Sequence, residues 1–463
     1  MNKTLIKILE SWANTEGNIN STSDLLEWIG NLNRTTYVNI NECSIYKSDF
    51  WFYDDYNGEV SNRKRSFFSI KGMRRFQNEK FISEQPIIIQ AEIGYIGIVC
   101  KEIDGVMNFL MQAKIEPGNV NCVQISPTIQ ATKSNFTRAH GGNLPSYLEY
   151  FESSTKYNVI FDQIQSEQAS RFYKKRNRNM IMEVTGSLEV YPNFKWMTLG
   201  QIKKLMEIDN LVNMDTRTVL SGIPLMTTRF TEKEMTYIET LFTDKEFFKS
   251  AFKTRPASSI IDIYQYVNNY KMFQDIEIAT VPLSQLVDWK IDEYGITCKK
   301  QADFMVRYYD IAISGREVQQ WVQPLFKAIG QATFGLIVTE IEGVAKYLVT
   351  ARSEIGSFDM LEVGSSIQLD PTHYVYYDNS IEKVFRKNLE NKKGILLDVM
   401  LSEEGGRFYH EQNRNVIMKL DAKELGELPK GYFWVDYSTL NYMIQINNCL
   451  NIQLRNLLSL LNI

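Results

Sequence analysis

The chain contains the same sequence pattern twice. A shift of 238 positions places Trp51 on Trp289 and Gln85-Pro86 on Gln323-Pro324. Near the middle the shift is 236, so that SEQASRFYKKRNRNMIM (166–182) lies over SEEGGRFYHEQNRNVIM (402–418). Solenoid repeats span only about 20–50 residues, so this longer period predicts a duplicated domain. We expect an N-terminal domain at 1–225 and a C-terminal domain at 226–463, each long enough to bury its own core.

Periodicity within each half favours an α+β domain. In the first half, DLLEWIGNLN predicts an amphipathic helix capped by Asp24. Residues 87–116 predict two strands joined by a turn at Asp104-Gly105, and further strands are expected at 157–165 and 178–184. A helix in TLGQIKKLMEIDNLV then closes the half. Strands that end in a packed helix indicate an α+β fold, here present twice.

Charge and cysteine content narrow the functional classes. The formal net charge is −4 with both signs spread along the chain, which argues against a general partner in nucleic acid or at a membrane surface. The five cysteines form no CxxC pair, as expected for reduced thiols in the cytoplasm. The N-terminus resembles no signal peptide, and no apolar run approaches 18 residues. We therefore expect a cytoplasmic protein.

One polar stretch of the first half stands out beside its apolar strands. If residues 114–132 form a strand, the even positions share one face. That face could be a solvated sheet surface, or it could bind a ligand, because Gln, Ser and Asn make directional hydrogen bonds. Its members are Lys114, Glu116, Gln124, Ser126, Thr128, Gln130 and Thr132.

A basic cluster follows at Lys174, Lys175, Arg176 and Arg178. It could be a solvated edge, or it could hold a diphosphate, for which arginine is suited. The second half keeps Arg414 but replaces the other three positions by His410, Glu411 and Gln412. The shared Asn-Arg-Asn triplets at 177–179 and 413–415 are therefore interpreted as architectural. Lys174, Lys175 and Arg176 are interpreted as ligand charge of the first half.

Comparison of the two copies also separates candidate acids and bases. Glu167 recurs as Glu403, so it could be a structural partner of Arg171 rather than a base. His140 has no counterpart and precedes Gly141-Gly142, a context that favours an acid or base, although a lone histidine is more often structural. Thr132, Ser134 and Asn135 are likewise specific to the first half.

Several common sites are missing from the sequence. It has no GxGxxG after a strand, no P-loop, no HExxH and no GxSxG. With three histidines and scattered cysteines, the sequence shows no group of residues at the spacing of metal ligands. We expect neither a metal nor a nicotinamide cofactor.

The polar stretches resemble a known family. LMQAKIEPGNVNCVQISPTIQATKSNFTRAHGG, PSYLEYF and SEQASRFYKKRNRNM in the first half are similar to nucleotide-diphospho-hexose 2,3-dehydratases, as are SGREVQQWVQPL and LSEEGGRFYHEQNRNVIM in the second. The resemblance covers nearly the whole chain. It implies a Nudix-like fold in each half and a homodimer. Neither half carries the Nudix metal-binding helix motif, so pyrophosphate hydrolysis is not expected.

The resemblance also implies a reaction. The substrate is a nucleotide-linked 4-keto-6-deoxyhexose, commonly the dTDP-glucose derivative, which loses water across carbons 2 and 3 without a cofactor. An NAD(P)H-dependent 3-ketoreductase then acts on the 3,4-diketo-2,6-dideoxy product. The second half is expected to carry a diverged ligand site and a dimer or structural role. The alternative is a non-catalytic nucleotide-sugar binder with a degenerate site.

Roles for individual residues follow from the implied reaction. The base is His140 or Glu167, and the donor to the carbon 4 oxygen is Lys114, Tyr147 or Tyr150. Lys175, Arg176 and Arg178 grip the diphosphate. The remaining expected substrate-binding residues are Glu116, Asn119, Gln124, Ser126, Thr128, Gln130, Thr132, Ser134, Asn135, Gln165, Ser166, Asn177 and Asn179. The family's tryptophan before Gln-Pro is absent from FISEQP in the first half but present in QWVQP, so that position is expected to pack rather than react.

Overall fold

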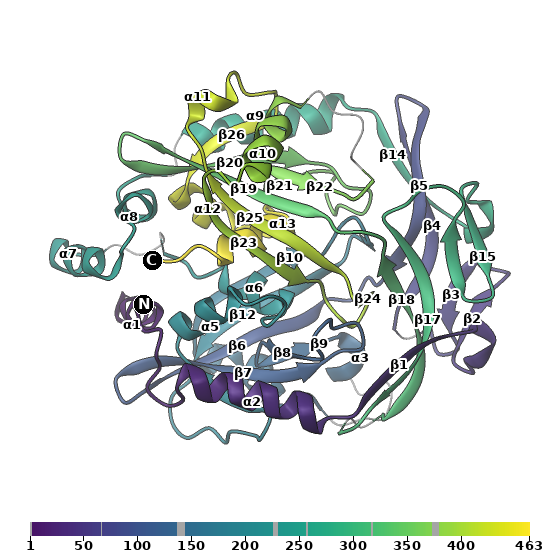
Figure 1. The fold of residues 1–463 in the computed structure, drawn as a ribbon, viewed down its shortest axis with the longest axis horizontal. Coiled ribbons are helices and arrows are strands. Elements are labelled where there is room, and N and C mark those ends of the chain that lie inside the picture. Colours follow the sequence, from purple (N-terminus) through teal and green to yellow (C-terminus); the bar gives the residue numbers. More distant parts are fainter. Residues whose placement is uncertain are drawn as a thin grey trace.

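The computed structural model describes residues 2–65, 67–136, 144–225, 230–255, 258–315, 318–372 and 379–463. Figure 1 shows two large sheets stacked on one side of the molecule and two smaller sheets side by side on the other. Within the described ranges, every helix is too short or too polar to traverse a lipid bilayer.

Each half contributes one large mixed sheet. In the first half the strand order is β10-β12-β6-β7-β13, with β8 paired to β7 and β9 to β6. The second half repeats this order as β23-β25-β19-β20, with β21, β22 and β26 in the places of β8, β9 and β13. In both sheets the central pair is parallel and the other neighbouring pairs are antiparallel. The first sheet consists of β6 (Gly94–Ile103), β7 (Val106–Ile115), β8 (Val123–Ser126), β9 (Ile129–Ala131), β10 (Asn158–Ser166), β12 (Arg176–Glu183) and β13 (Phe194–Met197), and the second of β19 (Thr333–Ile341), β20 (Val344–Arg352), β21 (Glu362–Ser365), β22 (Ile367–Leu369), β23 (Ile395–Ser402), β25 (Gln412–Lys419) and β26 (Tyr432–Asp436).

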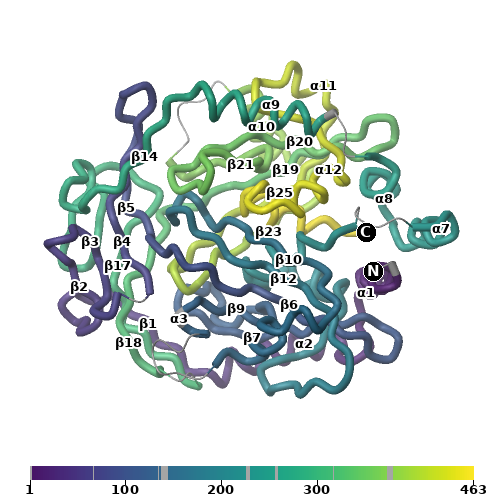
Figure 2. The backbone as a smooth tube through the Cα atoms, turned by 180° about the vertical axis from the view of Figure 1, so that it is seen from behind, coloured from purple at the N-terminus to yellow at the C-terminus, as the bar shows by residue number. Residues whose placement is uncertain are grey.

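The two smaller sheets exchange a strand between the halves. β1 (Val38–Cys43) pairs with β17 (Phe304–Ile313), so a strand of the first half completes the sheet of the second. Reciprocally, β14 (Ile276–Val281) pairs with β4 (Ser69–Gln77). Figure 2, which views the molecule from behind, shows each of these two strands beside the sheet of the other half. The other members are β2 (Trp51–Asp54), β3 (Glu59–Asn62), β5 (Lys80–Ile89) and β11 (Phe172–Tyr173) in one sheet, and β15 (Trp289–Asp292), β16 (Gly295–Cys298), β18 (Gln320–Ala328) and β24 (Phe408–Tyr409) in the other.

Helices lie between and around the large sheets. The main apolar core contains buried side chains from both large sheets and from helices of both halves, so the halves share one core. Most helices recur by the repeat: α1 (Asn2–Ala13) with α8 (Lys245–Phe252), α2 (Thr22–Thr35) with α9 (Ser258–Phe273), α5 (Leu199–Met206) with α12 (Tyr437–Met443), and α6 (Met214–Leu220) with α13 (Ile452–Ser459). α4 (Leu148–Glu152) and α10 (Ser380–Glu390) also correspond, since Phe151 and Phe385 lie against the repeat-related Gly97 and Gly335. The other helices in the described ranges are α3 (Lys133–Phe136), α7 (Glu232–Leu241) and α11 (Ala422–Leu425).

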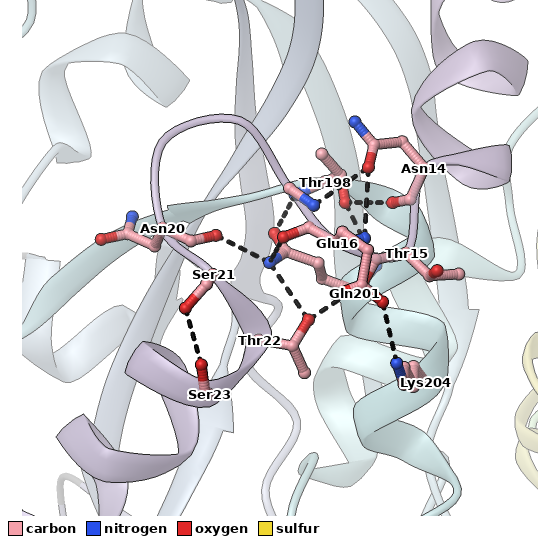
Figure 3. Close-up of polar contacts among 11 residues, drawn as sticks. Asn14, Thr15, Glu16, Asn20, Ser21, Thr22, Ser23, Thr198, Gln201 and Lys204 are labelled. Atoms are coloured by element: carbon pink, nitrogen blue, oxygen red, sulfur yellow. Dashed lines mark hydrogen bonds and ion pairs between the residues drawn. The ribbon is translucent and has the colours of Figure 1, made fainter.

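A polar cluster ties the loop after α1 to the start of α5. The Gln201 amide donates to the Glu16 and Asn20 carbonyl oxygens at 3.1 and 2.8 Å, and Lys204 pairs with Glu16 at 3.1 Å (Figure 3). Gln201 also completes a capping box with Thr198, which satisfies the first amide groups of α5. These bonds fix the position of the loop before α2, and α2 in turn leads to the exchanged strand β1.

The contacts between the halves are reciprocal. The Gly118 amide donates to the Gly405 carbonyl at 2.7 Å, and its counterpart Gly356 donates to Ala169 at 2.8 Å. Buried arginines repeat the pattern: Arg217 donates to the Ser402 carbonyl at 2.8 Å, and Arg455 donates to the Ser166 carbonyl. Such paired contacts define a pseudo-twofold, isologous interface inside one chain.

The structure confirms most expected elements and corrects two details. The Asp104-Gly105 turn joins β6 to β7 with φ values of 50° and 82°, as a tight hairpin requires. Ser21, not Asp24, caps α2, and Asp24 completes the capping box three residues later. Residues 114–132 do not form a single strand. Three strands divide this stretch, so its even positions do not share one face.

Candidate active site

A cavity of about 980 Å³ opens beside the large sheet of the first half. Its walls come from β6, β7, β9 and β12 and from the loops at Lys47–Trp51 and Gln90. The second half supplies another wall through the Gln320–Gln323 segment of β18 and through Glu404, Gly406 and Arg407. The C-terminal half thus does more than hold a diverged site, because it completes the cavity of the first half.

Charged side chains of both signs gather in this cavity. Five carboxyl groups line it: Glu116, Glu167, Asp215 and the exposed Asp49 from the first half, and Glu404 from the second. Lys114, Lys175 and Arg407 supply positive charge beside them. So dense a mixture of buried acids and bases is typical of a site that moves protons.

Short contacts hold several of these groups in place. Lys114 Nζ lies 3.2 Å from Glu116 Oε1, which also accepts from Gln130 Nε2 at 3.2 Å. Asn177 Nδ2 donates to Glu167 Oε1 at 2.6 Å, and Lys175 Nζ donates to the Glu92 carbonyl at 2.6 Å. Polar side chains of the cavity are therefore held in separate groups, one on β7 and β9 and others at the start of β12.

Arg407 is held at the wall that the second half supplies. Its Nη2 donates to Gln90 Oε1 at 3.1 Å, and its guanidinium carbon lies 4.2 Å from the Phe67 ring centroid. A planar cation held by an aromatic face is well placed to receive an anionic ligand.

Burial shifts the pKa values of these groups in opposite directions. Desolvation raises the pKa of Glu167, and desolvation together with repulsion from Glu116 raises the pKa of Glu404 to about 7. Burial and then repulsion from Glu167, Glu404 and Glu116 raise the pKa of Asp215 well above its usual range. Burial lowers the pKa of Lys175 to about 8. Groups with pKa values near neutrality suit acid–base catalysis.

The repeat-related position in the second half is almost filled. That pocket has a volume of about 20 Å³. Gln368, Glu411, Asn413 and Gln453 stand there in the places of Gln130, Lys175, Asn177 and Asp215. Polar groups of its lining bond one another, for example Asn413 Nδ2, which donates to Glu403 Oε1 at 2.8 Å. One cavity of the pseudo-symmetric pair is open for a ligand, and the other is closed.

The cavity brings together part of the predicted site. Its lining includes predicted residues from two of the three stretches that carry the resemblance in the first half: Lys114, Glu116, Thr128, Gln130, Thr132, Asn135, Glu167, Lys175 and Asn177. The predicted acid–base, sugar-binding and phosphate-binding candidates therefore meet in one place, although they come from separate strands.

Other predicted residues lie outside the cavity lining, and most of them donate a hydrogen bond to the scaffold. Gln124 donates to Ser402 Oγ at 2.6 Å, Ser166 donates to Glu362 Oε2 at 3.0 Å, and Gln165 donates to the Ile444 carbonyl, all across the interface between the halves. Asn119 donates to the Cys122 carbonyl, and Ser126 is buried in β8.

The predicted diphosphate arginines Arg176 and Arg178 and the aromatic donors are also outside the cavity lining. Arg178 forms a two-bond pair with Asp162 at 2.7 and 2.6 Å, and Arg176 lies 3.8 Å over the Phe358 ring. Tyr147 donates to the Glu189 carbonyl at 2.9 Å, and Tyr150 packs near Tyr157. His140 falls outside the described residues, as does the side chain of Ser134, but Asn135 and Pro145, on either side of that segment, both line the cavity.

The Asn-Arg-Asn triplets make the same contacts in both halves, which supports the interpretation that they are architectural. Asn179 donates to the Asn177 carbonyl at 3.0 Å, and Asn415 donates to the Asn413 carbonyl at 2.9 Å. Arg414 repeats the Arg178 pair by bonding Asp398 at 2.8 and 2.6 Å. Glu167 and Glu403 each accept from the first asparagine of their triplet rather than pairing with Arg171 or Arg407.

Sequence reasoning missed Asp215, Glu404, Arg407 and Trp321. The sequence could have indicated two of them, because the repeat aligns Asp215 with Gln453 and Glu404 with Gln168, so that only one copy has a carboxyl group at each position. Arg407 aligns with Arg171 and so looked structural. Trp321, whose position was expected only to pack, lines the cavity of the opposite half.

Both halves of the chain match one known protein family. The model of the NDP-hexose 2,3-dehydratase family matches residues 22–223 and again 261–461. The chain is 36% identical over 416 residues to the dTDP-4-dehydro-6-deoxy-alpha-D-glucopyranose 2,3-dehydratase of Saccharopolyspora spinosa, covering 89% of this chain and 85% of that protein. Enzymes of the same name from Amycolatopsis orientalis and Streptomyces violaceoruber are each 32% identical, over 98% and 95% of this chain and 93% and 97% of their own lengths. Because the match is doubled and nearly complete, the chain belongs to the NDP-hexose 2,3-dehydratase family.

Proposed function

We propose that this protein removes water across carbons 2 and 3 of dTDP-4-keto-6-deoxy-D-glucose in the cavity of its first half. The observation that carries the proposal is the contrast between an open cavity of about 980 Å³ lined by acids and lysines and a repeat-related pocket of about 20 Å³. A volume of several hundred Å³ is typical of ligand sites. The relatives' shared name supplies the substrate.

The reaction needs proton transfers and charge stabilisation, and it consumes no redox cofactor. The ketone at carbon 4 acidifies the hydrogen on carbon 3, and a base removes it. Negative charge then develops on the ketone oxygen while the carbon 2 hydroxyl leaves as water. The resulting enol tautomerises to the 3,4-diketo-2,6-dideoxy sugar. A positioned base, a proton donor and a cation near the ketone oxygen therefore suffice.

The contacts favour some of the predicted roles over others. The base is His140 or Glu167, and Glu167 lines the cavity with a raised pKa. Lys114 is the best-placed donor to the carbon 4 oxygen, because it lines the cavity whereas Tyr147 donates to a backbone carbonyl outside it. Gln130, Thr132 and Asn135 orient the sugar.

Cations of both halves grip the diphosphate in this proposal. Lys175 keeps its predicted role, and Arg407 takes the place of Arg176 and Arg178, which are engaged with Phe358 and Asp162. The half-buried Trp321 offers a ring in the same cavity on which the nucleobase can stack.

The decisive assay couples the protein to an NADPH-dependent 3-ketoreductase, because the diketo product is expected to be labile. Incubation with dTDP-4-keto-6-deoxy-D-glucose should yield a 2-deoxy sugar nucleotide. Saturable binding of the substrate without its loss would instead indicate a non-catalytic sugar-nucleotide binder.

Two substitutions identify the base. The variant that removes it, His140→Asn or Glu167→Gln, should lose deuterium exchange at carbon 3 in heavy water and still bind dTDP. The other variant should retain exchange. Retention of full exchange by both variants would remove both residues from this role.

We further propose that each half has a Nudix-like fold and that the chain forms a homodimer, as the family resemblance implies. The doubled α+β architecture supports the first expectation at a coarser level. Light scattering gives the mass in solution, and a mass near 53.8 kDa would contradict the dimer.

A further inference from the structure

Asp215 is a buried carboxyl group that no described residue satisfies. It stands in the first turn of α6, is 3% exposed and lines the cavity. Its carboxylate makes no hydrogen bond or ion pair with any residue in the described ranges. A carboxyl group that faces a cavity and has no described protein partner is available to a ligand bound there.

Glu404 brings a second unsatisfied carboxyl group to the same cavity from the other half. It follows β23 and lines the cavity, and it likewise lacks a side-chain partner among the described residues. The bond from the Gly118 amide to the Gly405 carbonyl anchors this loop across the interface. At Gly406 a Cβ atom would overlap Glu404 Oε1 and lie 3.5 Å from Glu116 Oε1, so glycine leaves room for these carboxyl groups to approach each other.

The closed pocket has amides at both positions. Gln453 takes the place of Asp215, and Gln168 takes the place of Glu404. Gln168 donates to Glu403, so the amide there satisfies a neighbour instead of facing open space. An amide resembles a carboxylic acid in shape but cannot release a proton. The two halves therefore differ in proton-transfer capacity at these two positions.

Charges from every side act on the pair. Glu116, Glu167 and Lys114 face it from the first half, and Arg407 and Lys175 lie beside Glu404. For Asp215, burial and the three neighbouring carboxyl groups outweigh Lys114, so its pKa lies well above its usual range and its protonated form is favoured.

We propose that Asp215 is the acid that protonates the departing hydroxyl of carbon 2, and that Glu404 is a positioning residue of the second half that keeps Asp215 protonated. This inference rests on the proposed function. The base takes the carbon 3 proton, the freed electron pair forms the carbon 2–carbon 3 double bond, and the carbon 2–oxygen bond breaks. The departing oxygen takes the Asp215 proton and leaves as water.

The same pair of groups restores the starting state. The Asp215 carboxylate accepts the proton of the carbon 3 enol hydroxyl, while carbon 2 receives a proton from the protonated base. One water molecule is released, and both groups return to their original protonation, so no external acid or oxidant is needed.

The first test separates proton removal from loss of the hydroxyl group. Asp215→Asn should lower dehydration of the natural substrate by about 10²–10⁴-fold, the usual contribution of a proton-transfer group. Deuterium exchange at carbon 3 should persist, because it precedes use of the acid. With the 2-deoxy-2-fluoro substrate, fluoride release should stay near the wild-type rate, because fluoride leaves without a proton. The matched control is Glu411→Gln, which makes the same kind of change in the closed pocket and should leave all three rates unchanged.

The second test uses the pH profile. Glu404→Gln removes a negative neighbour and so lowers the pKa of Asp215. The alkaline limb of kcat/KM, where the acid loses its proton, should therefore move to lower pH.

An unmoved limb, or an Asp215→Asn variant that dehydrates the natural substrate at the wild-type rate, overturns the inference. Equal loss of dehydration, exchange and fluoride release in Asp215→Asn also overturns it, by indicating a binding or structural role. A wild-type protein inactive on both substrates overturns the proposed function as well.

Discussion

At the scale of a single residue, Lys175 shows that a charged group placed in the cavity lowers the stability of the folded protein. Burial is the largest cause of its lowered pKa of about 8, so the folded protein disfavours the charged form. Because the unfolded lysine has a pKa of about 10.4, this destabilisation is complete below about pH 8 and is lost as the pH rises toward the unfolded value.

Lys175→Met is therefore expected to weaken dTDP binding and to raise Tm at pH 7, with a smaller gain at pH 9.5. Thermal melts at both pH values and a dTDP titration test this. The neighbouring Lys174, which is exposed, provides the control, since Lys174→Met should change neither property appreciably. A gain in Tm that grows with pH would contradict the assignment.

Arg217 makes the opposite contribution, because it holds the halves together. It is 1% exposed and donates to the Val212 and Ser402 carbonyls at 2.7 and 2.8 Å. Arg217→Met leaves both carbonyls without this donor and should cost about 2–4 kcal/mol in the free energy of unfolding.

Arg178→Met is the matched comparison for Arg217→Met. Its pair with Asp162 is one-third exposed, so solvent screens it and the loss should be about 0–1 kcal/mol. Denaturant unfolding of both variants measures the difference, and equal losses would show that Arg217 does not bridge the halves as described.

Local sequence identified the residues that the first half contributes to its own cavity. Lys114, Gln130, Glu167 and Lys175 were predicted because polar side chains interrupt apolar strands there. Arg407 and Trp321 were not, because they reach the cavity across the pseudo-twofold interface. A pattern within one segment carries no information about a partner more than 200 residues away, and only comparison of the copies could have pointed to Asp215 and Glu404.

Among the secondary-structure elements, the exchanged strands were the least predictable. β6, β7, β10 and β12 appeared as expected, because their apolar patterns and turn signals are local. β1 and β14 are short and partly exposed, and each finds its partner in the opposite half. Pairing of this kind depends on where the rest of the chain has folded, so strand propensity cannot reveal it.

Glycines mark where elements of the two halves touch. A Cβ atom at Gly118 would overlap the Phe408 carbonyl oxygen, which belongs to fixed backbone of the other half. Gly118→Ala should therefore lower Tm by several degrees and reduce activity, because it pushes the Glu404 loop away from the cavity.

Gly30→Ala is the control for Gly118→Ala. Gly30 lies inside α2, where the nearest atom to the added Cβ is the flexible end of Arg34 at 3.3 Å. This change should instead stabilise the protein by about 0.5–1 kcal/mol, because alanine favours helix over glycine. Thermal melts distinguish the two, and an unaltered Gly118→Ala variant would argue against the close approach.

For the whole molecule, strand exchange and a shared core mean that neither half is complete alone. We expect residues 1–225 and 226–463, expressed separately, to remain unfolded or to aggregate, because each would expose an unpaired strand edge and part of the common core. Co-expression should restore a complex with dehydratase activity. Circular dichroism and gel filtration test this, and a cooperative melt from either fragment alone would contradict it.

The reciprocal bonds between the halves also bear on how such a protein can arise. A polypeptide made of one repeat could close its sheet only with a second copy, and its two pockets would then be identical by symmetry. Joining the copies end to end removes that constraint. The pocket of one copy can then lose its acids and close. The residues of that copy that line the open cavity of the other copy must still be kept, because the remaining site needs them.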